Sequence, residues 1–256
     1  MSVIRYRPEI DGLRAIAVIS VLFYHVGFET FRGGFVGVDI FFVISGFLIT
    51  RLIRDEVNSS QAFSFSNFYL RRVRRLVPAL LFTLGLSSVC AYVLLSPQHL
   101  QIFGGSLASA ITSLSNFYFW RESGYFDAEV KFKPLLHTWS LCIEEQFYLF
   151  WPLLVTFLLL KKDKRYLLGT SIALFSISLL ANLVITEKFP DSASTIYYLA
   201  PFRVFEFMVG AVLVELVQFQ TKKQWVHEVL IVLGLIMILF PALVFTEKTV
   251  FPSYNA

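Results

Sequence analysis

An arginine and a histidine close the two ends of the apolar stretch RAIAVISVLFYH, residues 14–25. At about 100° per residue, Arg14 and His25 fall on nearly the same face of an α-helix, with a rise of ~16 Å between them. Ionisable side chains are costly inside a membrane and mark function there. We therefore expect His25 to act as a general base, assisted by Arg14. The alternative is that Arg14 extends to the membrane surface and that His25 makes a structural hydrogen bond to another helix.

A carboxylate follows in the next apolar segment, RGGFVGVDIFFVISGFLITRLI, residues 32–53. A hairpin between the two segments would return Asp39 toward His25. A carboxylate beside an imidazole fixes its tautomer and raises its basicity, which makes Asp39 a third catalytic candidate. The alternative is a hydrogen bond within its own helix. The same segment contains glycines that predict close helix approach, namely Gly33, Gly34, Gly37 and Gly46.

Four arginines stand together in FYLRRVRRLVPA, residues 68–79, just before an apolar run. Guanidinium groups bind phosphates bidentately, and no lysine occurs among them. We expect either a binding site for the phosphates of a ligand or an anchor that fixes topology and binds anionic lipid. The cluster consists of Arg71, Arg72, Arg74 and Arg75.

The stretch PLLHTWSLCIEEQFYLFWP, residues 134–152, places two adjacent carboxylates in an apolar helix. At least one of them must face the protein interior, since a carboxylate facing lipid is costly. Glu144 and Tyr148 are four residues apart and share a helix face with Ser140. We expect Glu144 to belong to the catalytic group, and Trp139, Ser140 and Glu145 to contact the substrate.

A second pair of opposite charges lies in FRVFEFMVG, residues 202–210. The spacing of Arg203 and Glu206 predicts a buried ion pair, which is either structural or borders the substrate. Hydrolase, nucleotide-binding and metal-binding motifs are not found in the sequence, so no metal is expected. Cys90 and Cys142 lie in apolar runs and are expected to pack as small apolar side chains.

The elements that must position these residues are membrane helices. Of the 256 residues 56% are hydrophobic and 16% charged, whereas soluble chains carry about 25% charged residues. The sequence predicts an all-α, polytopic transmembrane bundle of seven to eight spans, with segment 100–120 as a candidate re-entrant element. The predicted spans are 12–28, 35–53, 77–95, 138–160, 166–186, 196–218 and 228–246.

The positive charges predict the orientation of this bundle. Lys and Arg collect in cytoplasmic loops, which places the N-terminus and residues 54–76, 161–165 and 219–226 in the cytoplasm and residues 187–195 outside. Topology thus accounts for the net charge of +4, and no nucleic-acid partner is expected. No cleavable signal peptide is recognised. We expect a multi-pass protein of the cytoplasmic (inner) membrane whose partner is the lipid bilayer.

Five of these stretches resemble, in the same order, the acyltransferase 3 family of membrane-bound O-acyltransferases from about residue 6 onward. They are YRPEIDGLRAIAV, GGFVGVDIFFVISGFLIT, FYLRRVRRLVPA, LLHTWSLCIEEQFYLFWP and YYLAPFRVFEFMVG. The third and fourth are similar to the branch that modifies lipopolysaccharide O-antigen and related surface glycans. The resemblance implies transfer of an acyl group, commonly acetyl, from acetyl-CoA to a hydroxyl of a glycan or lipid-linked sugar.

The resemblance also implies roles for particular residues. Arg14 and His25 match the family's arginine and histidine of the first helix. The family's R-x-x-R pair matches Arg72 and Arg75, and the pair Arg71 and Arg74 fits the same spacing. We expect these arginines to hold the donor.

Members of this family usually continue with two or three more helices and often with an SGNH-type esterase domain, so the chain is expected to be C-terminally incomplete. Two other functions remain open. One is a transporter or flippase of an anionic or lipid-linked substrate, which internal inverted repeats would favour, although none is found. The other is an inactive, truncated remnant.

Overall fold

The computed structural model of the chain describes residues 7–123, 132–160, 164–189, 192–217, 223–246, 249 and 251–252. All regular structure in these residues is helical, as predicted. The α-helices are α1 (Pro8–His25), α2 (Gly37–Ser60), α3 (Phe65–Leu94), α4 (Pro97–Ile111), α5 (Ser115–Glu122), α6 (Thr138–Leu160), α7 (Lys164–Lys188), α8 (Ala193–Tyr198), α9 (Val204–Leu216) and α10 (Gln224–Val244). Short 3-10 turns are η1 (Glu29–Phe31), η2 (Gly34–Val36) and η5 (Ala200–Phe202).

Five helical segments of the described residues are long and apolar enough to cross a membrane. They are Gly34–Ser60, Phe65–Leu94, Thr138–Leu160, Arg165–Lys188 and Gln224–Val244. Each overlaps one of the predicted spans, and together they support a multi-pass membrane protein. The two remaining predicted spans, 12–28 and 196–218, are helical but do not meet this criterion. The larger number of seven to eight spans therefore stays a prediction.

The predicted span 196–218 is interrupted because of a proline. Pro201 has no N–H group and disfavours helical geometry in the residue before it. The chain accordingly leaves α8 at Tyr198, passes through η5, and enters α9 at Val204. At 1.5 Å per residue α9 is roughly 20 Å long, shorter than the ~30 Å core of a bilayer. The interruption places Arg203 at the N-terminal end of α9.

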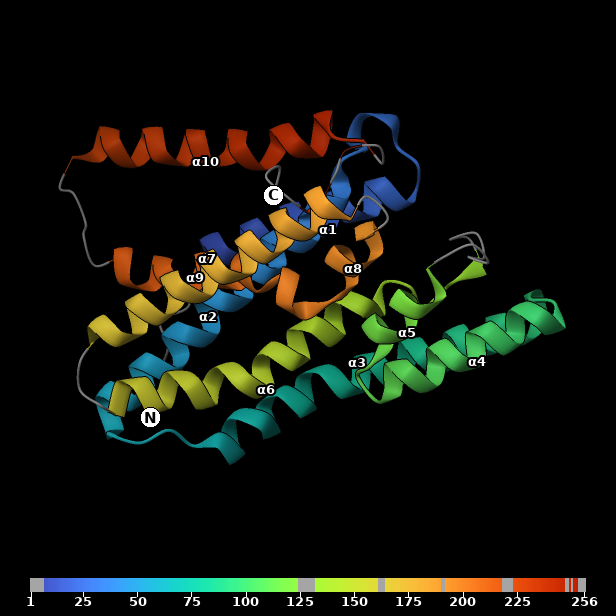
Figure 1. The fold of residues 1–256 in the computed structure, drawn as a ribbon, viewed down its shortest axis with the longest axis horizontal. Helices are drawn as coiled ribbons and strands as arrows, with labels where there is room; N and C mark the ends of the chain where they lie inside the picture. The colour runs from blue at the N-terminus through green and yellow to red at the C-terminus, as the bar shows by residue number, and fades with distance from the viewer. Residues whose placement is uncertain are drawn as a thin grey trace.

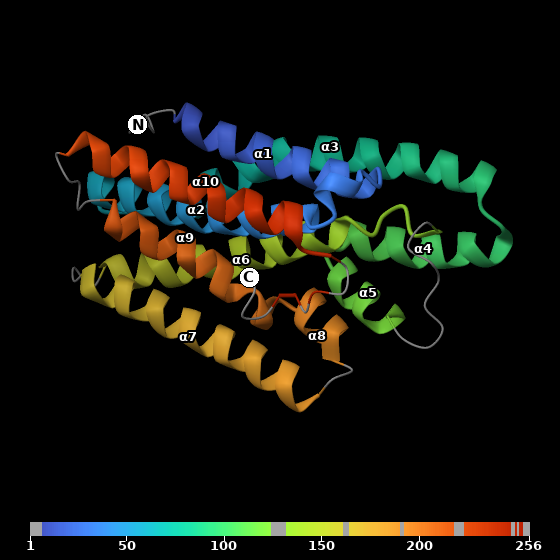
Figure 2. The same ribbon diagram turned by 90° about the horizontal axis from the view of Figure 1, so that it is seen from above.

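The segment 100–120 is also divided, into α4 and α5. Ser113 lies between them with a φ of 56°, a left-handed conformation that is uncommon for a residue other than glycine. Helix α4 returns along the end of α3 and packs against it through Leu84, Ala91 and Phe103. Figures 1 and 2 show this pair projecting from one end of the bundle. Whether the segment enters the membrane stays a prediction.

The termini of the helices group at the two ends of the elongated bundle. The starts of α1, α3, α7 and α10 and the ends of α6 and α9 lie toward one end (Figures 1 and 2). The ends of α1 and α7 lie toward the other. This grouping is the one that the predicted topology requires, although it does not say which end is cytoplasmic. Of the residues used for that prediction, 1–6, 161–163, 190–191 and 219–222 lie outside the described residues.

Helices α2, α6 and α9 form the centre of the bundle. The ring of Phe207 on α9 stacks on Phe42 of α2 and on Phe147 of α6, with centroid distances of 4.6 and 4.2 Å. The backbones of α2 and α9 approach so closely that a Cβ atom on Gly46 would collide with the carbonyl oxygen of Phe207. The predicted close approach is confirmed here, and likewise at the other three glycines, Gly33, Gly34 and Gly37. Of the cysteines, Cys142 is buried as expected, whereas Cys90 is exposed on α3.

Candidate active site

A carboxylate in the middle of the bundle is held by two hydroxyl groups. Glu144 of α6 accepts a hydrogen bond of 2.7 Å from the hydroxyl of Ser45 on α2. The hydroxyl of Tyr148 lies 3.1 Å from Oε2 of Glu144 and 2.9 Å from the Ser45 hydroxyl. The predicted common face of Glu144 and Tyr148 is thus confirmed. Ser45 was not among the predicted site residues, because nothing in the sequence relates α2 to α6.

One of the four clustered arginines reaches this carboxylate. Arg72 of α3 is half-buried, and its Cζ atom lies 4.7 Å from the ring centroid of Tyr148. The other three arginines of the cluster are exposed, and Arg71 lies 3.9 Å from Glu56. Two arginine pairs fit the R-x-x-R spacing, and only Arg72 joins the interior.

A second guanidinium group comes from α1. Arg14 interacts electrostatically with both Arg72 and Glu144, and it also lies 3.3 Å from Asp11. Four helices therefore contribute to one group, which we call the central polar cluster and which consists of Arg14, Ser45, Arg72, Glu144 and Tyr148. With Asp11 counted, two guanidinium groups face two carboxylates, and the guanidinium groups are the members of this cluster suited to an anionic ligand.

A cavity of 480 Å³ borders the central polar cluster between α3, α6 and the turn that joins α4 to α5. Arg72, Tyr148 and Glu145 line it together with apolar residues of α3. The hydroxyl of Ser113 donates a hydrogen bond to Glu145, so the residue in the left-handed conformation forms part of the wall. The predicted substrate contact Glu145 thus faces a cavity that is large enough for part of a ligand.

The imidazole of His25 lies exposed at the C-terminal end of α1. Its Nδ1 atom is 2.8 Å from the carbonyl oxygen of Val21. Because a carbonyl oxygen only accepts hydrogen bonds, Nδ1 carries the proton, and Nε2 is left with a free lone pair. The helix itself thus fixes the tautomer that can accept a proton from a ligand.

A second histidine accompanies His25 at this end of the bundle. His137 lies in the turn before α6 and interacts electrostatically with His25. Desolvation of its imidazole, and to a smaller degree the neighbouring His25, lower the pKa of His137 below its ordinary value. The backbone carbonyl of His137 accepts a hydrogen bond of 3.2 Å from Ser140. Sequence analysis assigned no role to His137, and its proximity to His25 appears only in the fold.

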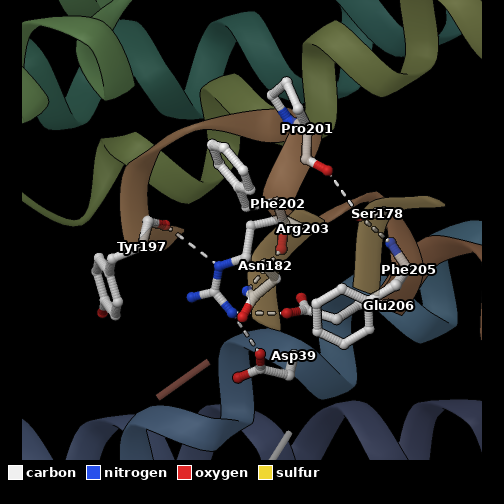
Figure 3. A network of polar contacts seen from close by, with 9 residues as sticks. All are labelled: Asp39, Ser178, Asn182, Tyr197, Pro201, Phe202, Arg203, Phe205 and Glu206. Carbon is white, nitrogen blue, oxygen red and sulfur yellow. Dashed lines mark hydrogen bonds and ion pairs between the residues drawn. The ribbon is translucent and has the colours of Figure 1, made fainter. Parts of the chain in front are cut away.

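The predicted ion pair of Arg203 and Glu206 is present, and it has a third member (Figure 3). Nη1 of Arg203 lies 2.6 Å from Oε1 of Glu206 and 2.7 Å from Oδ1 of Asp39. The Nε atom of Arg203 donates a hydrogen bond of 3.2 Å to the carbonyl oxygen of Tyr197. The Arg203 side chain is 1% exposed, and the buried ring of Trp139 lies against its guanidinium group.

Asp39 therefore has a different partner from the predicted one. The expected contact with His25 is not formed, because Asp39 lies on the other face of α2. Gly37 faces α1, where a Cβ atom would meet Ala17. A step of two residues turns the helix by about 200°, which directs Asp39 toward α9 and Arg203.

An acyltransferase domain model matches residues 7–254. The chain belongs to the acyltransferase domain family. The family predicted from the sequence motifs is therefore confirmed over almost the whole chain. The described residues contain no group of three or more His, Cys, Asp or Glu side chains suited to a metal ion.

The relatives of this acyltransferase domain are named as O-acetyltransferases. They include the peptidoglycan O-acetyltransferase OatA of Listeria monocytogenes, 38% identical over 211 residues, and the putative peptidoglycan O-acetyltransferase YrhL of Bacillus subtilis, 39% identical over 211 residues. The putative O-acetyltransferase SAS0844 of Staphylococcus aureus is 37% identical over 210 residues. Each match covers 82% of this chain, and the chain spans about a third of each relative: 34%, 33% and 34%. No solved structure matches the chain.

The names of these relatives bear on the predicted branch of the family. Two of them specify peptidoglycan, and the third names no acceptor. Lipopolysaccharide O-antigen, which the sequence motifs suggested, does not occur in these names.

Proposed function

We propose that this domain transfers an acyl group, in the simplest case acetyl, from acetyl-CoA to a hydroxyl of a cell-envelope glycan. Membership of the acyltransferase domain family supports acyl transfer. The names of OatA and YrhL favour peptidoglycan over O-antigen as the acceptor. The observation that carries the proposal is the central polar cluster, in which Arg72 borders a cavity of 480 Å³.

The donor would bind beside the central polar cluster. Arg72 lies two turns into α3, and its guanidinium group matches the geometry of a phosphate oxygen pair. The three exposed arginines around it add positive charge at the surface, where a soluble nucleotide arrives. Arg14 is on the same face of α1 as His25, so it would hold a polar group of the donor on the way to the histidine.

The acceptor hydroxyl would react at His25. A sugar hydroxyl is a poor nucleophile at neutral pH, and an imidazole can act as the general base that removes its proton. Nε2 of His25 takes this proton as the hydroxyl oxygen bonds to the thioester carbonyl carbon. The bond from this carbon to sulfur then breaks, and the thiolate takes the proton from Nε2. The products are a glycan ester and free coenzyme A.

The experiment is acyl transfer by the purified chain in proteoliposomes with radiolabelled acetyl-CoA. Peptidoglycan fragments and an O-antigen polysaccharide serve as alternative acceptors, and both free thiol and glycan ester are measured. Equal amounts of free thiol and of ester on peptidoglycan would support the proposal. Ester formed on O-antigen alone would show that O-antigen, and not peptidoglycan, is the acceptor. Movement of label across the membrane without ester formation would instead identify a transporter. Donor binding without thiol release would show that these 256 residues do not act alone.

A further inference from the structure

A second, smaller cavity lies at the end of the bundle where α1 begins. Its volume is 130 Å³, and α1, α2 and α9 line it. The residues around it are Arg7, Phe47, Arg51, Arg54, Asp55, Val214 and Val217. None of them belongs to the cavity beside Arg72, so this is a separate site, to which the proposed acyl transfer assigns no role.

Guanidinium groups dominate the lining of this cavity. Three arginines face one carboxylate, Asp55, among the lining residues. The side chains of Arg51 and Arg54 are only 18% and 14% exposed. Arg51 lies 3.5 Å from Asp55, and Arg54 lies 3.1 Å from Glu215 outside the lining. With Glu9 and Glu215 counted, three carboxylates pair with the three guanidinium groups. A guanidinium group has five N–H donors, more than one ion pair uses, so an anion in this partly desolvated cavity can still be bound.

The third arginine closes the cavity from the side of α1. Arg7 precedes the first residue of α1, and its Cζ atom lies 6.0 Å from the ring centroid of Phe47. Its Nε atom is 3.8 Å from Glu9, whose side chain is largely exposed. An ion pair with an exposed partner is weak, so Arg7 can turn its guanidinium group to a ligand at small cost.

We propose that this cavity binds a phosphate ester, and that its source is the headgroup of an anionic phospholipid. The guanidinium groups supply bidentate donors for phosphate oxygens. Apolar side chains of Phe47, Val214 and Val217 complete the lining and suit the first methylene groups of a lipid tail. The site lies near the polar C-terminal end of α2, which the positive charges predict to be cytoplasmic, and basic pockets between helices on that side bind lipid headgroups. The same phosphate chemistry occurs in soluble nucleotides, including coenzyme A.

The test is native mass spectrometry of the intact chain, titrated with phosphatidylglycerol and, separately, phosphatidylcholine. The wild type should retain phosphatidylglycerol in preference to phosphatidylcholine. Arg7→Gln with Arg51→Gln should weaken phosphatidylglycerol binding by roughly fivefold for each arginine removed. Arg32→Gln is the matched control, because this arginine is 60% exposed and pairs with Glu29 outside the cavity.

The outcomes distinguish a lipid headgroup from a soluble nucleotide as the source of the phosphate. Phosphatidylglycerol binding that the double variant loses and the control keeps supports the lipid site. Displacement of bound lipid by free coenzyme A, absent in the double variant, supports a phosphate site filled from the soluble pool. Equal phosphatidylglycerol affinity in the wild type and the double variant, or an equal loss in the control, overturns the proposal. If the double variant does not fold, undiminished binding by Arg7→Gln alone overturns it.

Discussion

Tyr148 connects a cation of one helix to a carboxylate of its own helix. The Cζ atom of Arg72 lies 4.7 Å from the Tyr148 ring centroid, and the Tyr148 hydroxyl lies 3.1 Å from Oε2 of Glu144. The ring therefore orients the guanidinium group that borders the larger cavity. An anionic ligand bound by Arg72 would therefore change the electrostatic environment of Glu144.

Arg72→Ala is expected to raise the KM for acetyl-CoA by about 10- to 100-fold, the value of one charge-assisted hydrogen-bonding group. Arg72→Lys should restore little of this loss, because lysine keeps the charge and lacks the planar fork. The control is Arg74→Ala, which removes an exposed arginine of the same cluster. Initial rates at varied acetyl-CoA measure the effect. A wild-type KM in both Arg72 variants would remove this residue from the donor site.

Substitution of His25 should abolish most of the chemistry and leave the fold intact. Loss of a general base typically lowers the rate ~10²–10⁴-fold, and this range is expected for His25→Ala. His25→Asn keeps an N–H group that can donate to the Val21 carbonyl, but it offers no basic nitrogen, so it should be equally slow. His99→Asn on α4 is the matched control. Single-turnover measurements give the rate of the acyl-transfer step. A near-normal rate in His25→Asn would mean that His25 is not the general base.

The buried group of Arg203, Asp39 and Glu206 should respond unequally to the loss of its members. Arg203→Gln leaves two buried carboxylates without their cation, and removal of one partner of a buried pair costs about 3–5 kcal/mol. Asp39→Asn leaves one cation with one carboxylate, so its cost should be smaller. The midpoint of thermal unfolding in detergent reports both. A larger loss in Asp39→Asn than in Arg203→Gln would contradict the arrangement in Figure 3.

Stability is expected to depend on pH through His137. Desolvation and the nearby His25 hold its pKa below the ordinary value of 6.5. Between the lowered pKa and 6.5 the unfolded chain binds more protons than the folded one, so stability increases with pH in this window. Stability should therefore fall as the pH drops below 6.5 and level off below the lowered pKa.

His137→Gln should flatten this dependence. Thermal midpoints of the wild type and the variant, measured from about pH 5 to about pH 8, make the comparison. A wild-type midpoint that rises on acidification would show that the sign is wrong.

The orientation predicted from positive charges can be tested with single cysteines. The native Cys90 is exposed and must be replaced first. Ser59→Cys near the end of α2 should be protected from an impermeant maleimide in intact cells, whereas Glu187→Cys near the end of α7 should react. Reaction of both positions from outside would contradict the topology, since the C-terminal ends of α2 and α7 lie toward opposite ends of the bundle (Figure 2).

The sequence predicted those parts of the fold that depend on local pattern. Long apolar runs predicted the five helices that can span a membrane, and i, i+4 spacing predicted the contact of Glu144 with Tyr148. The same reasoning joined residues 196–218 into one span, because average hydropathy does not register the missing N–H group of Pro201. A proline within an apolar run was the available signal.

Contacts between distant helices could not be predicted in this way. The spacing of Arg203 and Glu206 identified one ion pair, but Asp39 joins it only through the rotation of α2 against α9. Ser45 reaches Glu144 for the same reason, and His137 approaches His25 only after α6 is placed. Each of these contacts depends on helix register, and no local pattern in the sequence specifies it.

The partnership of Asp39 and Arg203 also has a consequence for how the chain is made. The two residues are 164 positions apart, so a ribosome that adds about 5–20 residues per second needs on the order of 10–30 s to pass from one to the other. Throughout this interval the newly made α2 contains a carboxylic acid without its cation. An unpaired carboxylate in the bilayer is costly, and the nascent chain must therefore keep Asp39 protonated or near the membrane surface until α9 emerges. The arrival of Arg203 then completes the insertion of a helix that was synthesised first.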